Sequence, residues 1–215
     1  LAAHEGIRSL TEACDELMGP GPSPRRTIAV TFDDGTADFV DHAVPILARH
    51  GVPATLYLAT RFADEGIDFP GGGPAVSWAG LRDACSTGLI DIGSHTHSHV
   101  LLDRLPAAEI GEELDRSIQL IEDHLGLTPR HFAYPKAVLG SPAAEAELRS
   151  RFATAAVAGT RPNPPRTTDL HRLARSPIQV SDGMRWFRKK ADGGLRLEDQ
   201  LRQQVNRRRY ADATT

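Results

Sequence analysis

The chain has 215 residues, of which 40% are hydrophobic and 25% are charged, and its formal net charge is −3. This length and composition are typical of one soluble globular domain, and the charge excludes a chain-wide attraction to nucleic acid. The sequence has no run of the ~20 apolar residues that a membrane span needs, and Cys14 and Cys85 lack the spacing of a zinc cluster or a disulfide framework.

Six short apolar segments, each bounded by glycine, proline or polar residues, predict β-strands. In chain order they are 27–33, 54–60, 89–94, 131–134, 153–158 and 173–180. Helical patterns separate them, and this alternation predicts a parallel sheet with helices packed outside it. Six such units are typical of a barrel or of a doubly wound sheet.

The clearest helix is predicted over 106–125, because its apolar residues recur at spacings of four and three and form one stripe. Pro106 suits its first turn, and Gly126 suits the position after its end. A second helix is predicted over 38–50, although Pro45 interrupts its first turns.

Two further kinds of segment stand out. The stretches 69–78 and 160–169 are rich in glycine or proline and predict surface loops. The basic runs 185–190 and 206–210 predict solvated helix faces rather than binding patches.

Polar side chains follow two of the predicted strands, at the ends where parallel α/β folds collect their chemistry. Asp33 and Asp34 end the first strand, and "GSHTHSH" (93–99) follows the third. In a helical turn, His95 and His99 would share a face and converge on a metal ion. Two histidines and one aspartate suit zinc or another divalent ion with open coordination positions.

Each motif has a simpler explanation when it is taken alone. Asp34-Gly35 is a common tight-turn pair, and "HTHSH" could be a polar loop. Together, at two strand ends, they favour a metal site. A cation there would neutralise one of the two adjacent carboxylates, and the second carboxylate would be free to take a proton from water.

Four motifs resemble one known family. "TFDDG" (31–35), "HTHSH" (95–99), "FAYP" (132–135) and "LHRLARSPIQV" (170–180) resemble the motifs of NodB-homology polysaccharide deacetylases of carbohydrate esterase family 4. The branch acting on poly-N-acetylglucosamine is the most similar. The resemblance covers nearly the whole chain and implies a single domain over 1–215, with a distorted (β/α)7-type barrel. It also implies a metal-dependent hydrolase of carbohydrate metabolism, which removes N-acetyl groups from a polysaccharide or an amino sugar.

The resemblance also implies roles for individual residues. Asp34, His95 and His99 would bind a divalent metal, with zinc expected and nickel, cobalt or manganese as alternatives. Asp33 would be the general base. Tyr134 and Pro135 would line the substrate groove, and Arg175 would support Asp33.

The sequence departs from the family pattern at two points. Lys136 stands where the branch commonly has an aromatic residue, which implies a different groove. No histidine of the chain matches a family motif for the general acid, and "LAAHEGIRSL" (1–10) resembles the segment that follows the N-terminal histidine motif. The acid is therefore expected upstream of Leu1, with His171 as the competing candidate.

Two rival functions stay open at this point. One is deacetylation of a small metabolite, and the other is carbohydrate binding by a chain that kept the fold but lost turnover. The expected partner is an N-acetylated glycan or amino sugar, with no nucleic acid. The sequence leaves the compartment, the oligomeric state and the exact sugar open.

Overall fold

The computed structural model describes residues 6–21, 27–70 and 72–193. Its centre is a six-stranded sheet in the order β1-β2-β3-β4-β5-β6, and every neighbouring pair is parallel. The strands are β1 Val30–Phe32, β2 Ala54–Leu58, β3 Ile90–Ser94, β4 His131–Ala133, β5 Thr154–Ala158 and β6 Leu173–Arg175. All six predicted strands are confirmed, and each is shorter than predicted. The last one ends at Arg175, shortly before Pro177, which has no N–H to donate to the ladder.

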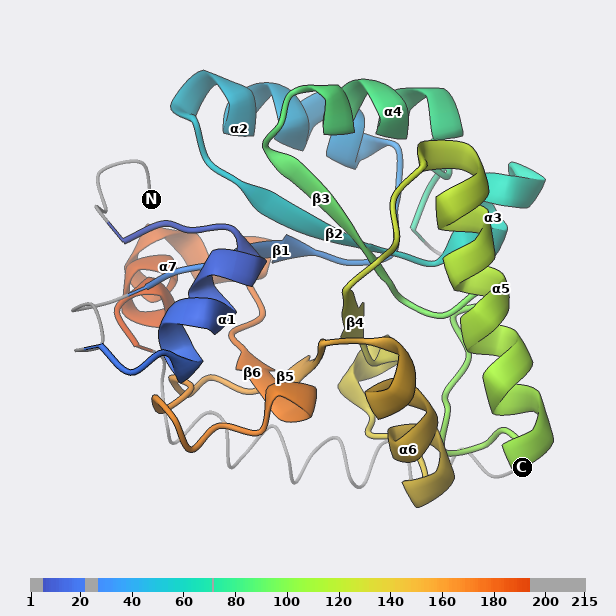
Figure 1. Ribbon diagram of the computed structural model, residues 1–215. Coiled ribbons are helices and arrows are strands. Elements are labelled where there is room, and N and C mark those ends of the chain that lie inside the picture. Colours follow the sequence, from blue (N-terminus) through green and yellow to red (C-terminus); the bar gives the residue numbers. More distant parts are fainter. Residues whose placement is uncertain (1–5, 22–26, 71, 194–215) are drawn as a thin grey trace.

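The sheet curls into a half-barrel (Figure 1). Its two outermost strands, β1 and β6, approach each other at their carboxyl ends, where Arg175 contacts Asp33. The paired stretch between β3 and β4 is short, with Ser94 opposite Phe132, whereas β2 and β3 pair along their whole length. The expected distorted barrel of alternating strands and helices is confirmed, and the described residues supply six strands to it.

The α-helices of the described residues are α1 Leu10–Met18, α2 Val44–His50, α3 Thr60–Glu65, α4 Trp78–Ser86, α5 Ala107–Leu125, α6 Pro142–Arg151 and α7 Gly183–Ala191. Most of them pack on the convex face of the sheet. Figure 1 shows α2 and α4 above β2 and β3, α5 at the right and α6 at the lower right. Leu47, Leu81 and Ile121 from three of these helices bury against β2 and β3 in the largest core cluster. No helix in the described ranges is both long and apolar enough to cross a membrane.

Helix α5 confirms its prediction to within one residue. Pro106 is its N-cap, and Gly126 ends it in the left-handed conformation with φ 67°. Helix 38–50 has a different form, because residues Phe39–Ala43 make a π-helical turn before α2. Pro45 lies in the first turn of α2, where its missing N–H removes one α-helical hydrogen bond.

Helix α1 covers the concave side of the sheet. Its N-terminus is fixed by a capping box between Ser9 and Glu12. Leu10 and Cys14 of α1 pack against inward-pointing side chains of four strands, including the fully buried Tyr57. This second core fills the inside of the curl below the carboxyl ends of the strands.

His131 makes the stability of this interior depend on pH. Its ring is buried, with Nε2 2.9 Å from Thr11 Oγ1 and Nδ1 2.9 Å from Thr154 Oγ1. Burial, and then the nearby Arg130 cation, lower the pKa of His131 from 6.5 to about 4. Since the unfolded chain binds the proton more tightly, the stability from neutral His131 is complete above about pH 6.5 and falls towards pH 4.

We expect the free energy of unfolding to fall by about 2 kcal/mol more between pH 7 and pH 5 in the parent chain than in His131→Gln. Glutamine keeps hydrogen-bonding atoms and does not titrate, so other ionising groups cancel in the comparison. Urea unfolding at the two pH values measures the difference. An equal pH dependence in both chains would show that His131 does not stay neutral in the folded protein.

Candidate metal and catalytic site

The first part of the site is the sharp turn after β1. Asp34 has φ 73° and Gly35 has φ 98°, both in the left-handed region. A Cβ at Gly35 would lie 2.4 Å from Leu58 Cδ1, so a side chain there would collide with β2. The glycine lets the chain turn close to β2, and this turn orients the carboxylate of Asp34 towards the end of β3.

His95 follows β3 and is held from two sides. Its backbone N–H donates to Leu58 O at 2.9 Å, and its side-chain Nδ1 is 2.7 Å from Ala133 O at the end of β4. The carbonyl can only accept, so Nδ1 carries the proton and Nε2 is left as a lone-pair donor. This arrangement of a ring fixed by a carbonyl is typical of metal-binding histidines.

The pairing of His95 with His99 does not come from a helical turn, which corrects the expectation from their spacing. Residues 95–99 form a bent loop in which Thr96 and His99 have φ 67° and 60°. Glu113 of α5 stabilises the loop, because it accepts from the backbone N–H and hydroxyl of Ser98 at 2.5 and 2.8 Å. Two left-handed residues therefore fold the loop back so that both rings approach Asp34.

Asp34, His95 and His99 form a candidate metal-binding triad. One ligand atom from each residue lies within 4.8 Å of the other two, and the described residues contain no other group of this kind. His95 Nε2 and His99 Nε2 lie 3.5 and 3.3 Å from Asp34 Oδ1. Two imidazole nitrogens and one carboxylate oxygen suit Zn²⁺ and other divalent transition metals, with positions left open. The donor set therefore fits a divalent cation.

Asp33 points to a different partner. Arg175 at the end of β6 donates to its two carboxylate oxygens at 2.6 and 2.9 Å, a bidentate pair that joins the outermost strands of the sheet. The same guanidinium donates to Thr31 at 3.1 Å and lies 5.0 Å from the ring centroid of Tyr57. Arg175 therefore fixes Asp33 beside the triad and outside it.

The charges of the site favour a carboxylate at Asp33 and neutral imidazole at His95. Burial raises the pKa of Asp33, but Arg175 and then the two histidines lower it by more, so that it lies below its usual range. Burial is also the main effect on His95, whose pKa is lowered despite the nearby carboxylates. Neutral imidazole is the form that binds metal.

Strained backbone marks the same edge of the sheet. Five of the six non-glycine residues with positive φ in the described ranges are Asp34, Thr96, His99, Lys136 and Ala137; the sixth, Arg166, lies in a loop beside α1. The five follow β1, β3 and β4, at the carboxyl ends of these strands. Such conformations are costly and concentrate at functional sites, so their clustering is evidence for a site that does not depend on residue type.

Tyr134 and Pro135 do not line a groove, which corrects the expectation for both. Each is buried, and the Tyr134 ring packs edge-on against Phe132 at 5.4 Å in the core under α5 and α6. The exposed residue of this stretch is Lys136, in the left-handed conformation. The segment contributes to the site through its backbone, by way of Ala133 O.

His171 is also separate from the site. It precedes β6, whose opposite end carries Arg175, and its Nε2 is 2.8 Å from Phe152 O just before β5. This places it at the amino end of the sheet, so the expectation that His171 is the general acid is wrong. The other expectation, an acid upstream of Leu1, stays a prediction; residues 1–5 lie outside the described ranges, as does the basic run 206–210.

Three supporting groups were missed by reasoning from the sequence. Glu113 fixes Ser98, Ala133 O fixes His95, and Thr60 Oγ1 lies 3.0 Å from His97 Nδ1 at the start of α3. Glu113 lies in the middle of a regular helix, and a backbone carbonyl has no sequence signature. Only the position of Thr60 at the end of a predicted strand was a signal that could have been used.

Comparisons with known proteins identify related sequences and structures. The sequence profile described as polysaccharide deacetylase matches residues 21–149, which include Asp33 and the whole triad. Among curated proteins, the poly-beta-1,6-N-acetyl-D-glucosamine N-deacetylase of Staphylococcus aureus is 27% identical in an alignment of 127 residues, which covers 54% of this chain. This chain spans 42% of that relative, less than half of its length.

Two solved structures show the same fold. IcaB from Ammonifex degensii has a TM-score of 0.74 and 26% identity, with 86% of this chain and 80% of that chain covered. The Streptococcus pyogenes deacetylase PplD, solved with acetate, has a TM-score of 0.75 and 18% identity, with 86% and 79% covered. With the family profile matching more than half of the sequence, the chain belongs to the polysaccharide deacetylase family.

Proposed function

We propose that this protein is a metal-dependent hydrolase that removes N-acetyl groups from an N-acetylated polysaccharide or amino sugar. The proposal is supported by family membership and by the N-deacetylase named among the curated relatives. The observation that carries it is the side-by-side placement of two carboxylates with different partners. Asp34 faces two histidines, whereas Asp33 is held by Arg175.

In this proposal Asp34, His95 and His99 hold the cation, most simply zinc. A cation bound there would supply Lewis-acid chemistry, since it polarises a carbonyl and lowers the pKa of water. Asp33, as a carboxylate, accepts the proton of the attacking water through a general-base step. Arg175 keeps Asp33 oriented. His95 stays neutral because burial lowers its pKa, and its Nδ1–H donates to Ala133 O, which leaves Nε2 to face the cation.

The expected reaction releases acetate and leaves a primary amine. Incubation of the metal-loaded protein with N-acetylglucosamine oligomers should therefore produce acetate and new amine in equal amounts, because each hydrolysed amide yields one of each. Enzymatic acetate assay and amine labelling measure the two products. Metal-stripped protein is the control and should produce neither.

Two other results would contradict the proposal and favour a different function. Acetate released from O-acetylated xylan without new amine would make the protein an esterase. If neither product forms although the protein binds metal through the triad, the result would favour a carbohydrate-binding protein that has lost its catalytic activity.

A further inference from the structure

The segment that follows β6 exposes an unusual number of large apolar side chains. Ile178, Met184 and Trp186 are 53%, 63% and 42% exposed, and Val180 is fully exposed. The other exposed large apolar side chains of the described residues are scattered singly over separate elements, namely Met18, Ile46, Ile67, Leu127 and Leu139. Single exposed residues are normal on a soluble surface, but four within one short segment mark a contact surface.

Cationic side chains accompany these apolar ones on α7. Arg185, Arg188 and Lys189 are exposed, in a chain whose net charge is −3. Lys189 Nζ lies 4.7 Å from the Trp186 ring centroid, and Arg185 Cζ lies 5.9 Å from it. The basic run 185–190 was expected to be a solvated helix face, and these three cationic side chains are exposed as expected. Together with the exposed apolar side chains beside them they form a mixed cationic and apolar surface, which we call the α7 surface (residues 178–189).

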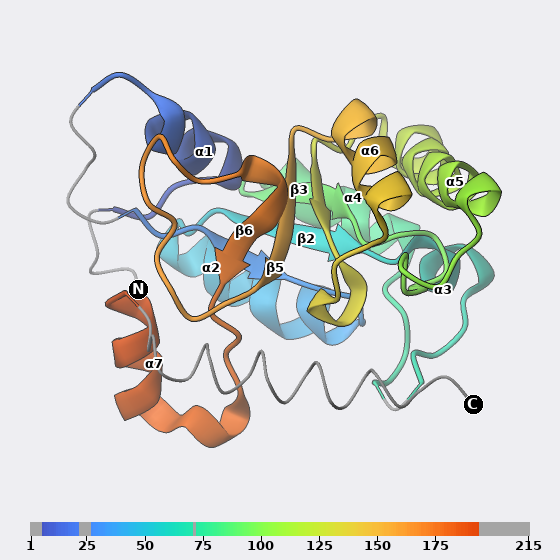
Figure 2. The same ribbon diagram turned by 90° about the horizontal axis from the view of Figure 1, so that it is seen from below.

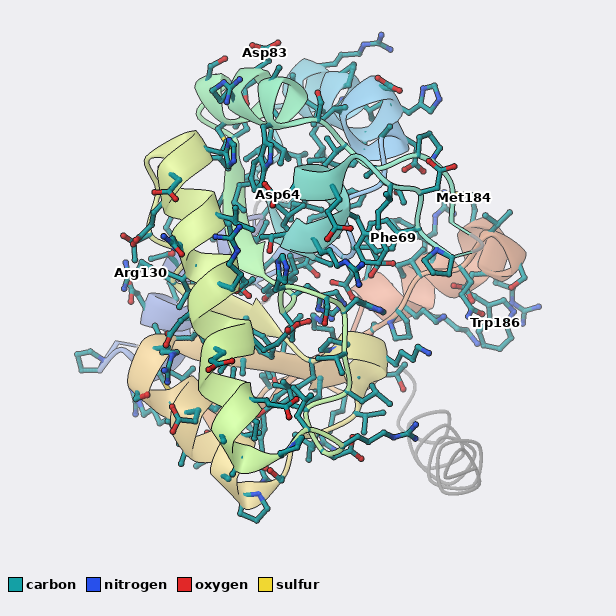
Figure 3. All side chains as sticks on the ribbon, turned by 90° about the vertical axis from the view of Figure 1, so that its right-hand side faces the viewer. Asp64, Phe69, Asp83, Arg130, Met184 and Trp186 are labelled. Atoms are coloured by element: carbon teal, nitrogen blue, oxygen red, sulfur yellow. The ribbon has the colours of Figure 1, made fainter. Side chains whose placement is uncertain are left out.

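A buried ion pair holds the segment of the α7 surface together. The Lys190 ammonium is 5% exposed as a residue and lies 2.8 Å from both carboxylate oxygens of Asp182 and 2.9 Å from Pro177 O. These contacts tie the helix to the segment that leads from β6. Figure 2 shows α7 standing away from the sheet, on the side towards which β6 points, and Figure 3 shows Met184 and Trp186 at that edge of the molecule.

We propose that the α7 surface docks on an anionic lipid membrane. Arginine and lysine are attracted to anionic headgroups, and a tryptophan beside them suits the interface between headgroups and acyl chains. Ile178, Val180 and Met184 favour lipid over a soluble polyanion, because aliphatic side chains gain nothing from a hydrated polymer. Since β6 ends at Arg175, which holds Asp33, docking would bring the candidate site close to the membrane surface.

Vesicle co-sedimentation of the full chain tests this proposal without any measurement of activity. We expect binding to vesicles of equal parts phosphatidylglycerol and phosphatidylcholine, and little binding to pure phosphatidylcholine. The double variant Met184→Ser/Trp186→Ser and the triple variant Arg185→Gln/Arg188→Gln/Lys189→Gln should each weaken binding by about 10-fold or more. Ile46→Ser is the matched control, because Ile46 is 55% exposed on α2 and should not matter.

Tryptophan fluorescence supplies a second measurement. The chain has two tryptophans, and Trp78 is buried and stacked on His124, so a blue shift on adding anionic vesicles should come from Trp186. The proposal is overturned if the parent chain stays in the supernatant, or if either variant binds as well as Ile46→Ser. Equal binding to neutral vesicles, or a Trp186-dependent dimer in analytical ultracentrifugation, would also overturn it.

Discussion

Replacing His95 or His99 with alanine is expected to weaken the binding of a divalent metal by more than about 100-fold. The loss of a hydrogen-bonding partner of a metal ligand typically costs 10- to 100-fold in affinity, and the loss of the ligand itself should cost more. Each variant removes one of the three donors that the described residues bring together, whose atoms lie within 4.8 Å of one another. Elemental analysis after dialysis against a mild chelator measures the metal that remains.

The control for this experiment lies between the two ligands. His97 belongs to the same loop, but its Nδ1 is 3.0 Å from Thr60 Oγ1 and it is not part of the triad. His97→Ala should therefore keep its metal. Full occupancy in both ligand variants, or equal loss in His97→Ala, would show that the cation binds elsewhere.

Changing Asp33 to asparagine is expected to lower the rate of deacetylation by ~100-fold or more, which is the usual effect of removing a general base. Asparagine keeps the shape of the side chain but cannot accept the proton of water as a carboxylate does. Metal binding should be unchanged, because Asp33 lies outside the triad and is bound by Arg175. Steady-state kinetics and metal analysis on the same protein samples measure the two properties.

Two companion variants make this result specific. Asp34→Asn should lose both metal and activity. Asp38→Asn, at a nearby acid that precedes the helical segment Phe39–Ala43 and lies outside both groups, should lose neither. A parent-like rate for Asp33→Asn at neutral pH would refute the assignment of Asp33 as the base. Loss of metal in that variant would instead make Asp33 a ligand.

The sequence by itself predicted the six strands and the long helix α5, and it placed the Asp33-Asp34 pair and the histidine loop at the same edge of the sheet. Each of these depends on local chemistry that can be read along the chain. Apolar runs between turn residues predict buried parallel strands, and a stripe at helical spacing predicts α5. Since the strands are parallel, residues that follow them meet at one edge of the sheet, and the resemblance to a known family then assigned Asp34 rather than Asp33 to the triad.

Position along the sequence was a poor guide for three residues. Tyr134 and Pro135 were assigned from a motif and His171 from its approximate place late in the chain, but the direction of a side chain depends on what packs around it. The ring of Tyr134 fills the core under α5 and α6, and His171 lies at the opposite end of β6 from Arg175. Neither the burial of Tyr134 nor the position of His171 at the amino end of the sheet follows from the local pattern of residues.

Only the tertiary structure decided which partner each of the two carboxylates has. Asp33 and Asp34 are adjacent in the sequence, yet the left-handed turn at Asp34 and Gly35 orients one carboxylate towards the histidines. The curl of the sheet brings Arg175 to the other, across 142 positions of the chain. Closure of a sheet is set by the packing of all its strands and helices, so the partner of Asp33 is a property of the whole fold.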